Sequence, residues 1–112
     1  MLPSHHRLRK QKDFDRVFKQ GRYINGPLFN VKFNSNGLPS SRFAFVVSAK
    51  TEKRATKRNS VKRRLRAVGQ ELLKNIKPGF DIVVLVKKPS LDSDHKALAD
   101  ELGVILKRAK LT

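Results

Sequence analysis

Residues 50–77 combine a dense run of positive charge with the periodicity of a buried helix face. They include eleven Lys or Arg residues against two Glu, and so contribute +9 of the net charge of +17. Charge runs of this density are usually disordered or solvated. Here, however, apolar residues recur at steps of four, three, four and four, which place them on one stripe of an α-helix. They are Val61, Leu65, Val68, Leu72 and Ile76. The segment is therefore predicted to be a helix packed against a core.

The opposite face of this predicted helix is polar and mostly cationic. At about 100° per residue, five side chains point away from the apolar stripe. They are Asn59, Lys62, Arg63, Arg66 and Gln70. Guanidinium groups match phosphate oxygens bidentately, and counterion release strengthens the binding of such a row to a polyanion. A face that serves only solubility is the alternative, but a net charge of about 2 to 8 suffices for that in a small domain.

The length of 112 residues predicts one domain, spanning residues 1–112, with a single core. A content of 38% hydrophobic and 31% charged residues is typical of a folded chain. The pI near 11.1 indicates nucleic acid or an anionic membrane surface as the partner. A membrane partner fits poorly, because the core needs the apolar stripe. No long apolar run or secretory signal is visible, so we expect a soluble cytoplasmic protein.

Residues 10–20 are predicted to form a short helix that ends at Gly21 in the C′ position, with Asp13 near its positive end. Phe14 and Phe18 lie four residues apart, on one face of that helix. Both rings could pack into the core. Alternatively, they could form a platform on which unpaired bases stack. The spacing alone leaves both interpretations open.

Two segments, residues 23–33 and 42–49, have the composition of strands. The first alternates apolar and polar residues, and Gly26-Pro27 within it indicates a bulge or an edge start. Turn residues at 35–39 separate the two segments, so they are expected to form an antiparallel hairpin. Residues 80–87 contain an unbroken apolar run, which is typical of a central strand. Because the basic helix lies between them, this strand should pair in parallel with residues 42–49, through a crossover that is right-handed by default.

A last helix is predicted from apolar residues at steps of four, three and four. They are Leu98, Leu102, Ile105 and Ala109. Asp92, Ser93 and Asp94 are expected to supply its capping oxygens. The neighbouring His95 could complete a metal cluster with the two Asp, but capping already accounts for these carboxylates. The adjacent His5 and His6 would point apart in either a helix or a strand, which also argues against a metal site.

No catalytic constellation is visible in the sequence. The nine carboxylates are scattered, and the chain has no cysteine. It also lacks a Gly-rich phosphate loop and a Ser-His-Asp order. We therefore predict a binding protein with no catalytic or metal-ligating residues of its own.

Residues 55–66, Ala-Thr-Lys-Arg-Asn-Ser-Val-Lys-Arg-Arg-Leu-Arg, resemble the Arg-Asn-Arg signature helix of the protein subunit of bacterial ribonuclease P. Three further blocks resemble the same family, in order and at its spacing: residues 7–21, 47–50 and 81–84. The chain departs from the pattern at Ser60, where the family has its second arginine, and at Ala67, where it has an acidic residue. The loop before the basic helix also lacks the family's usual glycine.

The resemblance implies an α+β fold, an α/β sandwich in which a mixed sheet is built in the order helix, strands, helix, strand, helix. It also implies a rare left-handed crossover for the basic helix. As a function it implies the protein subunit of an RNA-based endonuclease, which removes the 5′ leader of precursor transfer RNA. The RNA subunit and its magnesium ions would perform the hydrolysis, and the protein would bind no cofactor itself. The implied partners are the catalytic RNA and precursor transfer RNA, with no obligate protein partner.

The resemblance also implies two sets of contact residues. The set that would bind the catalytic RNA is Lys53, Arg54, Lys57, Arg58, Asn59, Lys62, Arg63 and Arg66. The set that would line a cleft for the leader is Phe14, Phe18, Ser48, Lys50 and Lys87. The alternative function is an RNA-binding module without a processing role, such as a ribosomal protein or an RNA chaperone. Dependence of affinity on leader length would separate the two functions.

Overall fold

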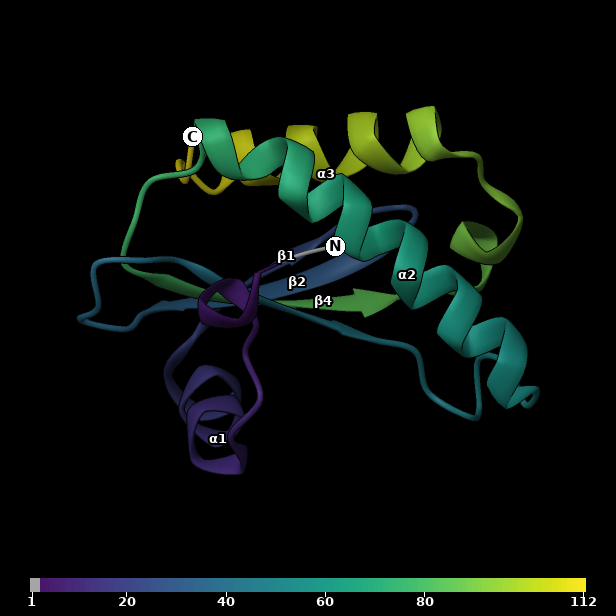
Figure 1. Cartoon of the computed structure of the whole chain (residues 1–112), viewed down its shortest axis with the longest axis horizontal. Coiled ribbons are helices and arrows are strands. Elements are labelled where there is room, and N and C mark those ends of the chain that lie inside the picture. Colours follow the sequence, from purple (N-terminus) through teal and green to yellow (C-terminus); the bar gives the residue numbers. More distant parts are fainter. Residues whose placement is uncertain (1–2) are drawn as a thin grey trace.

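In the computed structural model, which describes residues 3–112, a four-stranded sheet lies between two helical layers. Helix α1 covers one face of the sheet, and α2 and α3 cover the other (Figure 1). The elements are α1 (Gln11–Gln20), β1 (Arg22–Asn25), β2 (Phe29–Ser35), β3 (Arg42–Val46), α2 (Ala55–Leu72), β4 (Phe80–Val86) and α3 (His95–Arg108). Short 3₁₀ turns occupy Ser4–His6, Leu73–Asn75 and Lys88–Asp92. The α+β class and the mixed sheet are thus confirmed.

The strand order is β1-β2-β4-β3, with β4 antiparallel to β2 and parallel to β3. The central position of β4 and its parallel pairing with β3 are confirmed. The predicted hairpin between residues 23–33 and 42–49 is wrong, because β4 lies between β2 and β3. The middle of β4 is completely buried, at Ile82, Val83 and Val84. Successive side chains of a strand point to opposite faces, so both faces must be covered, as in the centre of a sheet. The left-handed sense of the crossover stays a prediction from the resemblance.

Residues 23–33 form two strands rather than one. β1 and β2 pair antiparallel, and the chain reverses between Asn25 and Phe29. The amide of Gly26 donates to the carbonyl of Phe29 at 2.8 Å. A Cβ at Gly26 would lie 2.8 Å from Cδ1 of Ile105, so the turn packs closely against α3. Gly26 and Pro27 therefore form a hairpin turn instead of the expected bulge or edge start.

The main core lies between the sheet and the pair α2 and α3. The predicted stripe of the basic helix is confirmed at Val61, Leu65 and Val68, all fully buried. The α-helix ends at Leu72, which is half-buried, and Ile76 lies beyond it in extended backbone. The stripe of α3 is also confirmed: Leu98, Leu102 and Ile105 are fully buried, and Ala109 packs at the margin.

A smaller apolar cluster joins α1 to the other face of the sheet, and consists of Leu8, Val17, Ala44 and Val83. The predicted helix end is confirmed, since α1 stops at Gln20. However, Gly21 has φ −73° and ψ 154°, so it is extended and does not adopt the left-handed conformation of a C′ glycine. A Cβ there would collide with the carbonyl oxygen of Val17 and lie 3.0 Å from that of Phe33. Glycine is needed for this close approach.

The start of α3 corrects part of the capping prediction. The carboxylate of Asp94 caps the helix by accepting from the amide of Ala97 at 2.8 Å. Asp92 instead belongs to the preceding 3₁₀ turn, and the hydroxyl of Ser93 donates to the carbonyl of Pro89 at 2.9 Å. The cap is therefore Asp94, while Asp92 and Ser93 belong to the preceding turn and its end. Over residues 3–112, no helix has the length and apolar character needed to cross a membrane.

Candidate nucleic-acid interface

The outer surface of α2 presents a row of cations that carboxylates do not neutralise. Arg63 and Asn59 are exposed, and Lys62 and Arg66 are half-buried. Among residues 3–112, none of Lys62, Arg63 and Arg66 lies within 4.0 Å of a carboxylate oxygen. A row of unpaired guanidinium and ammonium groups attracts a polyanion, and its affinity falls as salt rises.

The position of this row depends on how closely α2 approaches β3. The rings of Phe43 and Phe45 stack with centroids 5.5 Å apart and planes at 10°. Gly69 lies directly over this pair, and a Cβ there would be 3.1 Å from Cζ of Phe45. The buried residues on the same side of α2 complete the contact. As a result, the outer cations are held at positions set by a packed backbone.

Two of the predicted RNA-binding arginines also hold the loop before α2. Nη1 of Arg58 donates to the carbonyls of Glu52 and Lys53, each at 2.9 Å. Nε of Arg54 lies 3.0 Å from Oε1 of Glu52. The hydrogen bonds from Arg54 are the main cause that lowers the pKa of Glu52 to about 2, and the same pair raises the pKa of Arg54. Lys53 is exposed between them.

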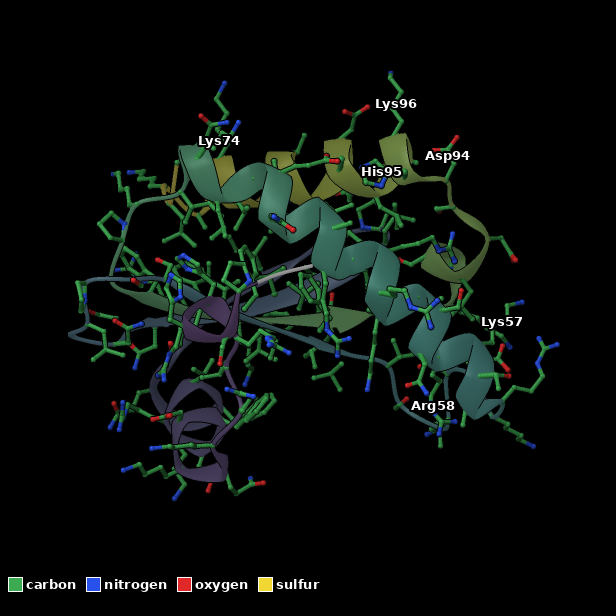
Figure 2. The ribbon with its side chains drawn as sticks, viewed as in Figure 1. Lys57, Arg58, Lys74, Asp94, His95 and Lys96 are labelled. Carbon is green, nitrogen blue, oxygen red and sulfur yellow. The ribbon has the colours of Figure 1, made fainter. Side chains whose placement is uncertain are left out.

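Other cations of α2 and of the turn that follows it lie outside the outer row. Figure 2 shows Lys57 and Arg58 projecting from the first turns of α2 and Lys74 at the other end of the helix layer. Nζ of Lys57 lies 4.0 Å from Oδ1 of Asp92. Arg64 faces the segment that precedes α3, where it donates to the carbonyl of Ser93 at 3.0 Å. This contact removes Arg64 from the outer row.

Phe14 and Phe18 differ in their surroundings. Phe18 is 41% exposed, and Nζ of Lys32 lies 5.3 Å from its ring centroid. The same ammonium donates to the carbonyl of Phe18 at 3.2 Å. Phe14 is half-buried and packs against the small cluster together with Val46 and Leu85. The structure therefore leaves the ring of Phe18 open, with a cation beside it.

The other three expected cleft residues follow the ends of β3 and β4. Because these strands are parallel, their ends bring Ser48, Lys50 and Lys87 to the same end of the sheet. Ser48 and Lys50 are exposed. Nζ of Lys87 donates to Oδ1 of Asn25 and to the carbonyl of Gly26, both at 2.6 Å. Lys87 thus ties β4 to the hairpin turn.

Sequence reasoning missed the ionic network that fixes α1. Arg42 lies between two buried carboxylates: its Nη2 is 2.7 Å from Asp81 Oδ2, and its Nη1 is 3.4 Å from Asp13 Oδ2. Asn36 also donates to Asp81 at 2.9 Å. Arg42 and Asp81 are register partners in parallel strands, which the sequence could have shown only once the strand pairing was known.

The sequence also did not indicate where the N-terminal segment lies. Residues 7 and 8 run along the free edge of β3, where the amide of Leu8 donates to the carbonyl of Phe43 at 2.7 Å. This pairing brings Arg7 and Arg9 next to Lys62 and Arg66 around one cavity. The positive charge near the start was visible in the sequence, but its proximity to α2 was not.

Metal ligands do not gather anywhere in the part of the chain that the structure describes. No group of three or more His, Asp or Glu side chains there could hold an ion. His95, the histidine considered with the two Asp, contacts Glu71 of α2 instead, at 2.8 Å. Asp94 is engaged as the cap of α3.

Residues 2–110 match the family model described as Ribonuclease P. The ribonuclease P protein component of Pseudanabaena sp. is 39% identical over 113 residues, which cover 99% of this chain and 97% of that protein. The component from Thermotoga petrophila is 39% identical over 106 residues, which cover 91% of this chain and 90% of that protein. Among solved structures, the RNase P protein of Thermotoga maritima has a TM-score of 0.82 at 36% identity, covering 91% of this chain and 96% of that chain. A mutant RNase P protein of Staphylococcus aureus has a TM-score of 0.86 at 28% identity, covering 96% of this chain and 91% of that chain.

Proposed function

The chain belongs to the ribonuclease P protein family, and from this premise we propose that it helps a catalytic RNA to remove the 5′ leader of precursor transfer RNA. The observation that carries the proposal is the presence of two different surfaces. The outer face of α2 presents unpaired cations, whereas the opposite side of the sheet presents the open ring of Phe18 beside Lys32. One surface suits a folded RNA, and the other suits a single strand.

The catalytic RNA binds the face of α2 through Lys53, Asn59, Lys62, Arg63 and Arg66. Structured RNA presents rows of phosphates, and a rigid helix presents its cations at fixed positions opposite them. Lys57 can join this contact, since its ion pair with Asp92 is long and lies at the surface. Arg54 and Arg58 contribute charge while they hold the preceding loop.

The leader binds on the α1 side of the sheet. A single-stranded segment is bound by stacking of its bases and by cations near its backbone. Phe18 offers the stacking ring, Lys32 and Lys50 supply charge, and Ser48 is an exposed hydroxyl at the same end of the sheet. Lys87 acts by fixing the hairpin turn at that end. Phe14 contributes mainly by supporting α1.

Phosphodiester hydrolysis takes place on the RNA partner, which holds the magnesium ions. The protein supplies positive charge and a single-strand site, so it raises affinity for the substrate and assists the RNA. We place this activity in the cytoplasm, where transfer RNA precursors are processed in bacteria.

A reconstitution assay tests the proposal. The protein is combined with the ribonuclease P RNA of the same organism, at low magnesium, and precursor transfer RNAs with leaders of graded length are supplied. The protein alone should not cleave, the complex should cleave at the mature 5′ end, and affinity should rise with leader length until the cleft is filled. An RNA-binding module without a processing role would bind RNA and leave cleavage unchanged. That result would reject the proposed function.

A further inference from the structure

We propose that the cavity at the free edge of β3 binds one unpaired nucleotide of the catalytic RNA, an inference that rests on the proposed function. This cavity, here called the edge pocket, lies where α1, β3, α2 and the N-terminal segment meet. Its volume is about 250 Å³. That is several times the roughly 30 Å³ occupied by a water molecule in the liquid. The edge pocket is therefore large enough for a planar organic group.

The lining of the edge pocket divides into an apolar part and a cationic part. Apolar side chains come from three elements: Leu8 from the N-terminal segment, Phe14 from α1, and Phe45 and Val46 from β3. Aromatic and aliphatic walls favour a flat heteroaromatic ring, whose face can stack whatever its sequence identity. A free phosphate ion would leave these apolar walls without a partner.

The cationic part consists of Arg7, Arg9, Lys62 and Arg66, and no carboxylate lines the edge pocket. Within residues 3–112, none of these four side chains forms an ion pair. Four like charges around one cavity repel each other, and an anion between them relieves that repulsion. A phosphodiester group next to a stacked base supplies such an anion.

Arg7, which lines the edge pocket, has a buried donor without a partner in the part of the chain that the structure describes. Its Nε is buried and has no hydrogen-bond partner among the described residues, although buried donors are nearly always satisfied. Arg9, by comparison, is exposed, and its Nη2 donates to the hydroxyl of Ser4 at 2.6 Å. Because Arg7 lines the edge pocket, its guanidinium group can donate to a base carbonyl or a phosphate oxygen bound there.

The neighbours of the edge pocket favour the catalytic RNA over the leader as the source of the nucleotide. Lys62 and Arg66 belong both to the edge pocket and to the outer row of α2. A strand docked along α2 can therefore place a phosphate between them and turn its base toward β3. Of the set expected to bind the leader, only Phe14 lines the edge pocket, where it also supports α1. The open ring of Phe18 and the neighbouring Lys32 do not line it.

Filling the edge pocket while keeping its charges tests this inference. Val46→Trp puts an indole into the space, and Val104→Trp is the matched control on the exposed surface of α3. The ribonuclease P RNA is probed with base-specific reagents in the presence of each protein. We expect wild-type protein and Val104→Trp to protect an unpaired base of this RNA that Val46→Trp leaves reactive. Affinity should fall about 5- to 160-fold with Val46→Trp, by the loss of one stacked base. Circular dichroism checks that both variants fold.

A charge variant keeps the test valid should Val46→Trp fold poorly. Arg9→Gln removes one exposed cation of the edge pocket, and Arg108→Gln removes an exposed cation from the end of α3 as its control. Arg9→Gln should raise the reactivity of the same base and lower the salt dependence of RNA binding by about one phosphate contact. Arg108→Gln should change neither.

Two results would overturn the inference. One is an unchanged protection pattern with folded Val46→Trp and with Arg9→Gln. The other is a protected base that lies in the leader of precursor transfer RNA and not in the catalytic RNA. In both cases the wild-type complex would still process its substrate, so the proposed function would stand. Failure of the wild-type protein to stimulate cleavage would instead reject the proposed function itself.

Discussion

The guanidinium of Arg42 donates two hydrogen bonds to the carboxylate of Asp81, from Nε at 2.8 Å and from Nη2 at 2.7 Å. Asp81 is only 2% exposed, and the two residues form the first register pair of β3 and β4. The same guanidinium approaches Asp13 of α1 at 3.4 Å. The bond to Asp81 is the main cause that raises the pKa of Arg42. The network fixes α1 against the sheet, and with it the position of Phe18.

Replacing Arg42 with Met should therefore destabilise the protein strongly. Asp81 would remain buried without a cation, and breaking a buried pair in this way costs about 3 to 5 kcal/mol. Arg16→Met is the control, because Arg16 lies 3.6 Å from Asp13 but is largely exposed. It should cost about 0 to 1 kcal/mol. Urea unfolding measures both, and equal losses would contradict a structural role for Arg42.

Glu52 should titrate near pH 2, because the hydrogen bonds from Arg54 stabilise its charged form. Its folded pKa lies below the ordinary value of 4.5, so this ion pair stabilises the fold above about pH 4.5. That contribution is lost as the pH falls from there through about 2. Carboxyl carbon shifts measured by NMR give the midpoint. Arg54→Gln should move it toward 4.5 and Arg63→Gln should not; no response to Arg54→Gln would refute the pairing.

Gly21→Ala should destabilise the protein even though its backbone angles are open to alanine. The added Cβ collides with the carbonyl of Val17, and relieving such overpacking costs about 1 to 3 kcal/mol. Gly103→Ala in α3 is the matched control, since a Cβ there meets nothing within 4 Å. It should stabilise by about 0.5 to 1 kcal/mol, as alanine favours helix. Thermal unfolding distinguishes the two, and stabilisation by both would argue against close contact at Gly21.

Arg63→Gln and Arg58→Gln should affect different properties. Arg63 is exposed and unpaired among the described residues, so its loss should weaken binding to the catalytic RNA and lower the salt slope by about one. Folding stability should stay within about 0.5 kcal/mol. Arg58 bonds two loop carbonyls, so its loss should reduce stability as well as affinity. Titrations at several salt concentrations, together with urea unfolding, separate these effects; the same stability loss in both variants would contradict the assignment.

Phe18→Ala tests the open ring on α1. We expect affinity for a leader-bearing substrate to fall by about 1 to 3 kcal/mol per folded molecule, the value of one stacked base. Substrate without a leader should bind unchanged. Phe29→Ala, a fully buried phenylalanine in β2, should instead cost about 3 to 5 kcal/mol of stability. If Phe18→Ala lowers only stability and leaves leader affinity intact, the ring belongs to the core.

Most elements of the fold were predictable from local patterns. The periodicity of Val61, Leu65 and Val68 placed the buried side of α2, and the apolar run of β4 indicated a central strand. The strand order was not predictable in this way. A turn between two strands suggests that they pair with each other. Here, however, β4 lies between β2 and β3, because its apolar side chains on both faces are buried best in the centre of the sheet.

The candidate interface shows the same division. Charge and helical phase identified Lys62, Arg63 and Arg66 as an outward row, and the structure places Arg63 and Asn59 at the surface as expected. The phase could not show that Arg58 bonds the preceding loop, because that contact depends on how the loop folds back. Nor could it place Arg7 and Arg9 beside α2, because a pairing with the edge of β3 creates that contact.

By itself, then, the sequence determined most of the helices and strands, and that one helix presents a cationic face. Both are properties of residues close together in the chain, where side-chain spacing sets burial. Only the tertiary structure decided which strands pair, which carboxylates meet Arg42, and which cations remain free for a ligand. These depend on contacts between residues far apart in the chain, and burial of the whole core selects among them.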